Sequence, residues 1–117
     1  MLLKEKEEIY ADKITQYMNT AKPYLDADLT LPGLAIMLQI PPHHLSRVIN
    51  EKFGINFFDF INQYRIEEVK SKIVNPEFDN LTLLGIAFDC GFNTKSAFNR
   101  VFKKMTGLTP SEYKNLS

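Results

Sequence analysis

The sequence predicts an all-α domain of about seven helices, in which two copies of a helix-turn-helix unit are joined by a long helix. Three observations support this prediction. The chain contains an internal repeat, each copy carries signals that start and end helices, and no long stretch alternates apolar and polar residues as a β-sheet requires. With 117 residues, 44% of them hydrophobic, the chain can bury a core without a metal or a disulfide.

The N-terminal segment, residues 1–24, is predicted to form one amphipathic helix after a charged lead-in. The helix is expected from about Glu7 to Thr20, because apolar residues recur there at helical spacing. Pro23 prevents its continuation. The residues expected on or near its buried face are Ile9, Ile14, Tyr17, Met18 and Ala21. Residues Lys4–Glu8 are expected to be solvated.

The internal repeat appears when the first half of the chain is aligned with the second. DLTLPGLA (residues 28–35) matches NLTLLGIA (residues 80–87) at an offset of 52. After a one-residue insertion the match resumes at an offset of 53, where LSRVINEKFGIN (residues 45–56) parallels FNRVFKKMTGLT (residues 98–109). Such a repeat indicates two copies of one structural unit, and the insertion falls in the predicted turn.

The first unit is assigned to residues 25–55. Its first helix is expected at Leu31–Leu38 with Thr30 as N-cap, because a threonine hydroxyl accepts a hydrogen bond from a first-turn amide. Two consecutive prolines interrupt the pattern, so the second helix begins near His43 and ends by Gly54, a residue suited to the left-handed conformation.

The second unit is assigned to residues 75–117 and follows the same plan. Its first helix is expected at Leu83–Cys90 with Thr82 as N-cap. After a turn that begins with glycine, the second helix is expected to begin near Lys95 and to end by Gly107.

Two further helices complete the prediction. A long helix in residues 56–74 is expected to bridge the units, and a short helix at Pro110–Leu116 is expected to close the second. Each begins like a capping box: Asn56 and Thr109 are both followed three positions later by an acidic residue.

The net charge is zero, which taken alone argues against a nucleic-acid partner. The distribution of charge is more informative. Residues 91–117 contain five basic residues and one acidic residue, whereas residues 1–30 and 31–90 each carry two more acidic than basic residues. The positive charge is therefore concentrated at the C-terminal end.

The location expected for the chain is the cytoplasm. Cys90 is the only cysteine and the start of the chain does not resemble a signal peptide, which together favour a reducing compartment. The apolar runs are much shorter than the ~20 residues that a membrane helix requires, so no membrane contact is expected.

The second helix of each unit has an outward face suited to DNA. Apolar residues spaced for burial are Leu45, Val48, Ile49 and Phe53 in the first unit, and Phe98, Val101 and Phe102 in the second. The opposite face of the first unit carries His43, Arg47 and Asn50, flanked by Ser46 and Glu51. The opposite face of the second unit carries Ser96, Arg100 and Lys103, flanked by Asn99 and Lys104, with Lys95 at the start.

An α-helix fits the major groove, where arginine donates two hydrogen bonds to guanine and asparagine pairs with adenine. The alternative is that each face is an ordinary solvated surface. The recurrence of an arginine at matched positions, Arg47 and Arg100, favours DNA recognition over that alternative.

The chain resembles the AraC/XylS family of bacterial transcriptional regulators from about Leu29 to Tyr113. The strongest motif is GFNTKSAFNRVFKKMTGLTPSEY (Gly91–Tyr113), supported by LSRVIN (Leu45–Asn50) and FINQYRI (Phe60–Ile66). This resemblance implies a homeodomain-like fold and sequence-specific binding of double-stranded DNA. It also implies that both second helices enter successive major-groove segments.

The resemblance also implies which residues contact DNA. The positions that match the family's base-reading positions are His43, Ser46, Arg47, Lys95, Ser96, Asn99 and Arg100. Asn50 is also expected to contact a base, because it lies on the same outward face as His43 and Arg47. The residues expected to contact phosphate are Thr30 and Thr82 at helix N-termini, together with Lys103, Lys104 and Lys114.

Two other functional classes agree less well with the sequence than DNA binding does. A helical module that contacts RNA polymerase or a partner subunit would suit the zero net charge, but it does not explain the repeat. An enzyme is not expected, because the sequence shows no plausible pair of nucleophile and base, no evident carboxylate pair and no phosphate loop. No cofactor is expected. Family members usually carry a separate sensor or dimerisation domain, which we expect upstream of this segment.

Three further features are an adjacent histidine pair, the single cysteine and Arg65 in the long helix. His43 and His44 point about 100° apart on a helix and lack further ligands, so no metal is expected. Cys90 is expected to be a buried structural thiol. Arg65 has two equally supported roles, either as a phosphate contact or as a brace that pairs with Glu68 or Asp59.

Overall fold

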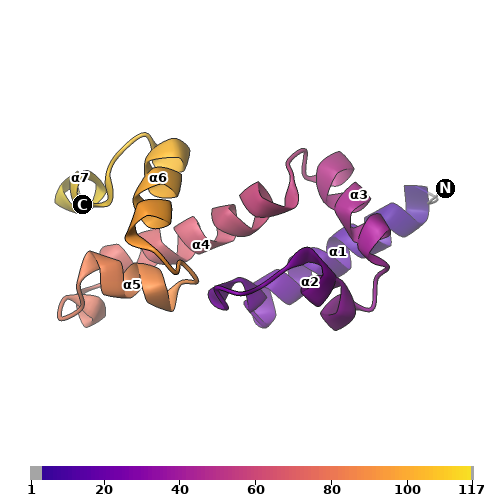
Figure 1. Ribbon diagram of the computed structural model, residues 1–117, viewed down its shortest axis with the longest axis horizontal. Coiled ribbons are helices and arrows are strands. Elements are labelled where there is room, and N and C mark those ends of the chain that lie inside the picture. The colour runs from indigo at the N-terminus through magenta and orange to yellow at the C-terminus, as the bar shows by residue number, and fades with distance from the viewer. Residues whose placement is uncertain (1–3, 117) are drawn as a thin grey trace. The chain divides into compact units, whose positions relative to one another are not determined.

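The computed structural model describes residues 4–116, which form seven α-helices and two short 3-10 helices without a strand (Figure 1). The elements are α1 (Lys4–Thr20), η1 (Pro23–Leu25), α2 (Leu31–Leu38), α3 (Pro42–Lys52), α4 (Phe57–Ile73), η2 (Pro76–Phe78), α5 (Leu83–Asp89), α6 (Lys95–Thr106) and α7 (Pro110–Leu116). The all-α prediction is confirmed. None of the helices in this range combines the length and apolar character needed to span a membrane.

The chain forms two compact units, and α4 contributes residues to both. Within the described residues, one unit contains residues 4–23 together with Asp28–Ile61, and the other contains Tyr24–Ala27 together with residues 62–116. We call them unit 1 and unit 2. The short segment Tyr24–Ala27 therefore belongs to unit 2 although it lies between α1 and α2 in the sequence.

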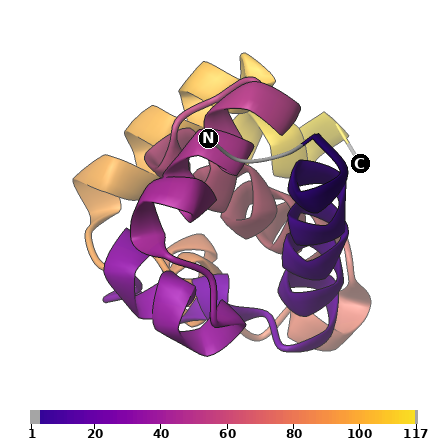
Figure 2. The same cartoon turned by 90° about the vertical axis from the view of Figure 1, so that its right-hand side faces the viewer.

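Unit 1 is built from α1, α2, α3 and the first part of α4. Helix α1 is continuous and packs against α2 and α3 (Figure 1 and Figure 2). The core side chains of this unit include Ile14, Met18, Leu34, Leu38, Leu45, Val48, Ile49 and Phe60, each at most 2% exposed. Three of these come from α3, whose predicted core positions Leu45, Val48 and Ile49 are confirmed. Phe53, the fourth residue predicted for this buried face, is only half-buried, because it lies at the C-cap after the last turn of α3.

The start of α1 differs from the expectation in two respects. The helix begins at Lys4, so the residues predicted to be a solvated lead-in are helical, and Glu7 among them is buried. Ile9, in contrast, is 64% exposed, although it was predicted to face the core. The buried face is set by Glu7, Ile14 and Met18, and Ile9 lies about 200° around the helix from Glu7.

The other two predicted residues of the α1 face are not in the core either. Tyr17 is half-buried, and Ala21 is exposed just after the end of the helix. Only Ile14 and Met18 of the expected set are fully buried.

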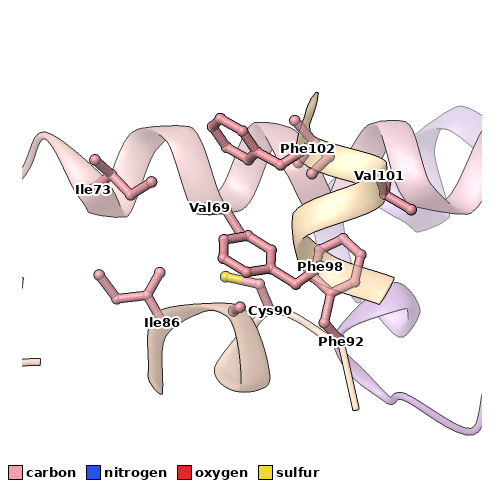
Figure 3. Close-up of a cluster of buried hydrophobic side chains, with 10 residues drawn as sticks. Val69, Ile73, Ile86, Cys90, Phe92, Phe98, Val101 and Phe102 are labelled. Carbon is pink, nitrogen blue, oxygen red and sulfur yellow. The ribbon is translucent and has the colours of Figure 1, made fainter. Parts of the chain in front are cut away.

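Unit 2 has a core rich in aromatic rings. Figure 3 shows side chains from α4, α5 and α6 gathered around Cys90, whose thiol is fully buried as predicted. The rings of Phe92 and Phe98 lie 5.4 Å apart and those of Phe98 and Phe102 lie 5.8 Å apart between centroids. The first pair is tilted and the second is edge-to-face, and inclined ring pairs of this kind pack favourably.

The helix boundaries in both units follow from capping residues. The hydroxyl oxygens of Thr30 and Thr82 accept hydrogen bonds of 3.1 and 2.9 Å from the amides of Gly33 and Gly85. These predicted N-caps are therefore confirmed. A third threonine, Thr94, caps α6 in the same way and was not predicted.

Candidate nucleic-acid interface

Helix α3 has the outward face that its sequence predicts. Because Leu45, Val48 and Ile49 are all 0% exposed, the opposite side of the helix is directed to solvent. His43, Arg47 and Asn50 are exposed there, and Ser46 is half-buried beside them. The Asn50 side-chain amide donates a hydrogen bond of 2.9 Å to the Ser46 carbonyl, which leaves its second N–H and its oxygen for another partner.

Arg47 is held between two carboxylates. Its Nε atom lies 3.3 Å from Oε1 of Glu51, one turn further along α3, and 3.6 Å from Oε1 of Glu7 on α1. A neighbouring ion pair joins the same two helices, with Nζ of Lys52 3.7 Å from Oε1 of Glu8. The interface between α1 and α3 thus contains acidic side chains from α1 and basic side chains from α3.

This contribution of α1 differs from the expectation for residues Lys4–Glu8, whose high charge predicts a solvated segment. The signal was nevertheless present, because Glu7 precedes Ile14 by two helical turns and thus lies on the same face of α1 as Ile14 and Met18.

Helix α6 presents the corresponding face of unit 2. Phe98, Val101 and Phe102 are at most 5% exposed, and the four predicted base-reading residues Lys95, Ser96, Asn99 and Arg100 are all exposed. Within residues 4–116, no carboxylate lies within 4 Å of the Arg100 guanidinium, in contrast to Arg47. The two matched arginines therefore have different electrostatic surroundings.

The residues predicted to contact phosphate are all exposed in their own units. Lys103 and Lys104 lie in the last turn of α6, and Nζ of Lys103 is 3.9 Å from Oε1 of Glu112. Lys114 lies in the last turn of α7. Thr30 and Thr82 accept bonds through their oxygens as N-caps, and their hydroxyl hydrogens remain chemically able to donate to a phosphate.

Arg65 acts as a brace, but through different partners from those expected. Its Nε donates a hydrogen bond of 2.7 Å to the Tyr24 carbonyl, and Nη2 donates one of 2.9 Å to the Asp26 carbonyl. The expected pairing with Glu68 or Asp59 is replaced by these backbone acceptors. Burial lowers the pKa of Arg65, and the nearby Asp26 opposes this shift.

Gly91 makes room for this brace. Its φ of +103° lies in the region that favours glycine, and a Cβ atom there would overlap both the Tyr24 carbonyl oxygen and the Arg65 side chain. The turn before α6 is thus packed directly against the segment that Arg65 holds.

The two adjacent histidines do not form part of a larger ligand cluster. Their ring centroids lie 4.1 Å apart, and the described part of the chain contains no group of three His, Cys, Asp or Glu side chains placed to hold a metal ion. His43 is exposed at the start of α3, as a base-reading role requires, and His44 is half-buried.

The chain is similar to known helix-turn-helix proteins over most of its length. A family model described as a helix-turn-helix domain matches residues 34–115. An uncharacterized HTH-type transcriptional regulator of Staphylococcus aureus (strain COL) is 31% identical over 103 residues, a match that covers 88% of this chain and 13% of that protein. The chain therefore spans about 13% of the length of this curated relative.

Solved structures give the same result. The C-terminal domain of AraT, a response regulator from Geobacillus stearothermophilus, superposes with a TM-score of 0.78 at 29% identity, covering 93% of this chain and 85% of that one. The C-terminal domain of the two-component response regulator yesN from Fusobacterium nucleatum superposes with a TM-score of 0.72 at 31% identity, covering 89% and 97%. These similarities extend over both units.

Proposed function

Because the chain belongs to the AraC-type family of helix-turn-helix transcriptional regulators, we propose that it binds double-stranded DNA sequence-specifically, with α3 and α6 in separate major-groove segments. One observation carries this proposal. Each of these helices buries its apolar side in its own unit and exposes an arginine, Arg47 or Arg100, at matched positions of the repeat.

The proposed base contacts divide between the two helices. Arg47 and Arg100 are suited to guanine and Asn50 and Asn99 to adenine, because their side chains offer the required pairs of hydrogen-bonding atoms. The remaining proposed base-reading residues are His43, Ser46, Lys95 and Ser96. Phosphate contacts would fix the orientation of the helices on the DNA. We assign these contacts to Lys103, Lys104 and Lys114 and to the helix N-caps Thr30 and Thr82.

We propose one bipartite DNA-binding domain with the following division. Residues 1–24 are the N-terminal helix with its lead-in, residues 25–55 the first helix-turn-helix unit, residues 56–74 the linker helix and residues 75–117 the second helix-turn-helix unit. Because the chain spans about 13% of its relative, we further propose that it is the output domain of a longer bacterial regulator with a sensor or dimerisation domain upstream.

A second function, contact with RNA polymerase or a partner subunit, is favoured by a different feature of the repeat. Ile36 on α2 and Phe88 on α5 occupy matched positions and are 78% and 46% exposed. A protein partner that covers such side chains would remove their apolar surface from water, which favours association. This function is compatible with DNA binding, because these residues lie on the first helix of each unit and the proposed DNA contacts lie chiefly on the second.

The experiment that tests the proposed function is selection of bound duplexes from a randomised pool, followed by gel-shift titration at about 50 and 200 mM salt. We expect enrichment of an asymmetric site and saturable binding that weakens with salt. Failure to enrich any sequence, together with retention of a partner protein, would favour the interaction module instead.

A further inference from the structure

The two matched arginines differ in their carboxylate neighbours. Arg47 has Glu7 and Glu51 within 4 Å, whereas the described residues place no carboxylate that close to Arg100. Glu51 is part of α3 itself, but Glu7 comes from α1. The chain thus uses a separate helix to bring a negative charge to one proposed recognition helix.

The Glu7 side chain is largely buried where α1 contacts α3. Its side chain is 11% exposed, compared with 46% for Arg47 and 49% for Glu51. A buried carboxylate costs free energy unless it is paired, so Arg47 stabilises Glu7 as much as Glu7 restrains Arg47. Because Glu7 is buried, salt screens its field less than that of an exposed carboxylate.

The charge balance of the two helices is correspondingly different. At α3, two cations, Arg47 and Lys52, are paired with three carboxylates, those of Glu7, Glu8 and Glu51. At α6, Nζ of Lys103 lies 3.9 Å from Oε1 of Glu112, and within residues 4–116 no carboxylate lies within 4 Å of the Arg100 guanidinium. The carboxylates around α3 lower its attraction for a DNA phosphate.

A carboxylate that offsets the charge of an arginine weakens the arginine's contact with a phosphate more than its contact with a base. Attraction to phosphate depends on net charge, whereas recognition of guanine depends on N–H groups directed at O6 and N7. In both ion pairs of Arg47, the carboxylate lies at Nε, on the side of the guanidinium. The two terminal nitrogens of the Arg47 guanidinium form a second pair of hydrogen-bond donors, at the end of the side chain.

We propose that Glu7 is a specificity-determining residue. By offsetting the charge of Arg47, it reduces the affinity that α3 obtains from the phosphates of unrelated DNA, so that Arg47 contributes mainly through base recognition. This inference rests on the proposed function. Specificity is a difference between two affinities, so a charge that weakens binding to the wrong sequences increases it.

The test begins with the duplex that the wild-type chain selects from a randomised pool. If no duplex is selected, the proposed function itself fails. If one is selected, its Kd and that of an unrelated duplex are measured for the wild-type chain, Glu7→Gln and Glu5→Gln between about 50 and 200 mM salt. Glu5 is an exposed acidic residue in the same first turn of α1, so its variant controls for the change in net charge.

We expect Glu7→Gln to tighten binding to unrelated DNA more than to the selected duplex. The ratio of the two affinities should fall by about 2- to 5-fold, the range of a partly exposed ion pair. The slope of log affinity against log salt for unrelated DNA should steepen by up to about 0.9, equivalent to one additional phosphate contact. Glu5→Gln should leave the ratio unchanged, and adding Arg47→Ala should abolish the effect of Glu7→Gln.

Two results would overturn the inference. One is an unchanged affinity ratio in folded Glu7→Gln. The other is weaker binding to the selected duplex alone, which would mean that Glu7 only orients Arg47. If Glu7→Gln does not fold, Glu51→Gln replaces it, because Glu51 is exposed and neutralises the same arginine. An unchanged ratio in that variant contradicts the proposal equally.

Discussion

Arg65 and Tyr24 lie 41 positions apart in the sequence, and Nε of Arg65 donates a hydrogen bond of 2.7 Å to the Tyr24 carbonyl oxygen. The same guanidinium also binds the Asp26 carbonyl. Because Arg65 belongs to α4, these bonds hold the segment between α1 and α2 within unit 2. The positive charge of Arg65 therefore has a structural partner that does not require DNA.

Arg65→Ala should reduce the free energy of unfolding by about 1.5–3 kcal/mol, because two carbonyl groups lose a charged donor. Chemical denaturation measures this change, with Gln63→Ala, an exposed position on the same helix, as the control. The salt dependence of DNA binding by the folded variant should match that of the wild-type chain. A slope shallower by about 0.9 would show that Arg65 also contacts phosphate.

Gly91→Ala should destabilise the chain more than Gly54→Ala. Both glycines have a positive φ, so each substitution costs about 1–2 kcal/mol from the backbone alone. A Cβ at Gly54 would enter open space, whereas one at Gly91 would overlap the Tyr24 carbonyl and Arg65. We expect an additional loss on the order of 1–3 kcal/mol at Gly91. Equal unfolding midpoints for the two variants would contradict this account.

The sequence predicts those parts of the fold that depend on local signals. Helix α2 begins and ends where Thr30 and the apolar spacing indicate, and Gly107 closes α6 in the left-handed conformation. The helix-turn-helix units follow from the repeat, because two copies that share caps and core positions constrain each other's interpretation.

The sequence does not predict contacts in which a side chain meets a distant backbone or a charged residue is buried. Arg65 was expected to pair with a carboxylate nearby in the sequence, but backbone carbonyls leave no mark in residue type. Glu7 was expected to be solvated, because charge is usually exposed, and its burial depends on how α1 packs against α3.

Glu112 should make stability depend on pH in the acid range. Its Oε1 accepts a hydrogen bond of 2.8 Å from the Thr109 amide, and bonds with Thr109 lower the pKa of the carboxyl below its ordinary value of 4.5. A lowered pKa means that the stabilisation is complete above about 4.5 and is lost as the pH falls through the folded-state pKa.

The wild-type chain should therefore be more stable than Glu112→Gln at neutral pH, and the difference should disappear in acid. Thermal unfolding of both chains between neutral pH and pH ~3 measures this difference. A stability difference between the two chains that grows as the pH is lowered would contradict this prediction.

Lys103 and Lys104 should contribute affinity without sequence preference. Both are exposed in the last turn of α6, away from the base-reading residues at its start. Replacing both with glutamine should weaken binding to selected and unrelated duplexes by the same factor and make the salt slope shallower by up to about 1.8. A loss restricted to the selected duplex would indicate base contacts instead.

Arg47→Ala and Arg100→Ala should each relax sequence preference, and they should do so at different base pairs. Loss of a bidentate contact with guanine should cost about 1–3 kcal/mol of specific binding in each case. Repeating the selection from a randomised pool with each variant identifies the affected positions. If both variants alter the same base pairs, α3 and α6 do not read separate segments.

The two variants should differ in stability, although the matched positions of the repeat gave no reason to expect this. Arg100→Ala removes an exposed side chain and should leave the unfolding midpoint close to that of the wild-type chain. Arg47→Ala leaves the buried Glu7 carboxylate without its partner and should lower the midpoint. The double variant Glu7→Gln/Arg47→Ala should recover part of this loss, because a neutral amide is less costly to bury than a carboxylate. If Arg47→Ala and Arg100→Ala unfold at the same midpoint, Glu7 does not depend on Arg47 for its burial, and the loss of specificity in both variants reflects DNA contacts alone.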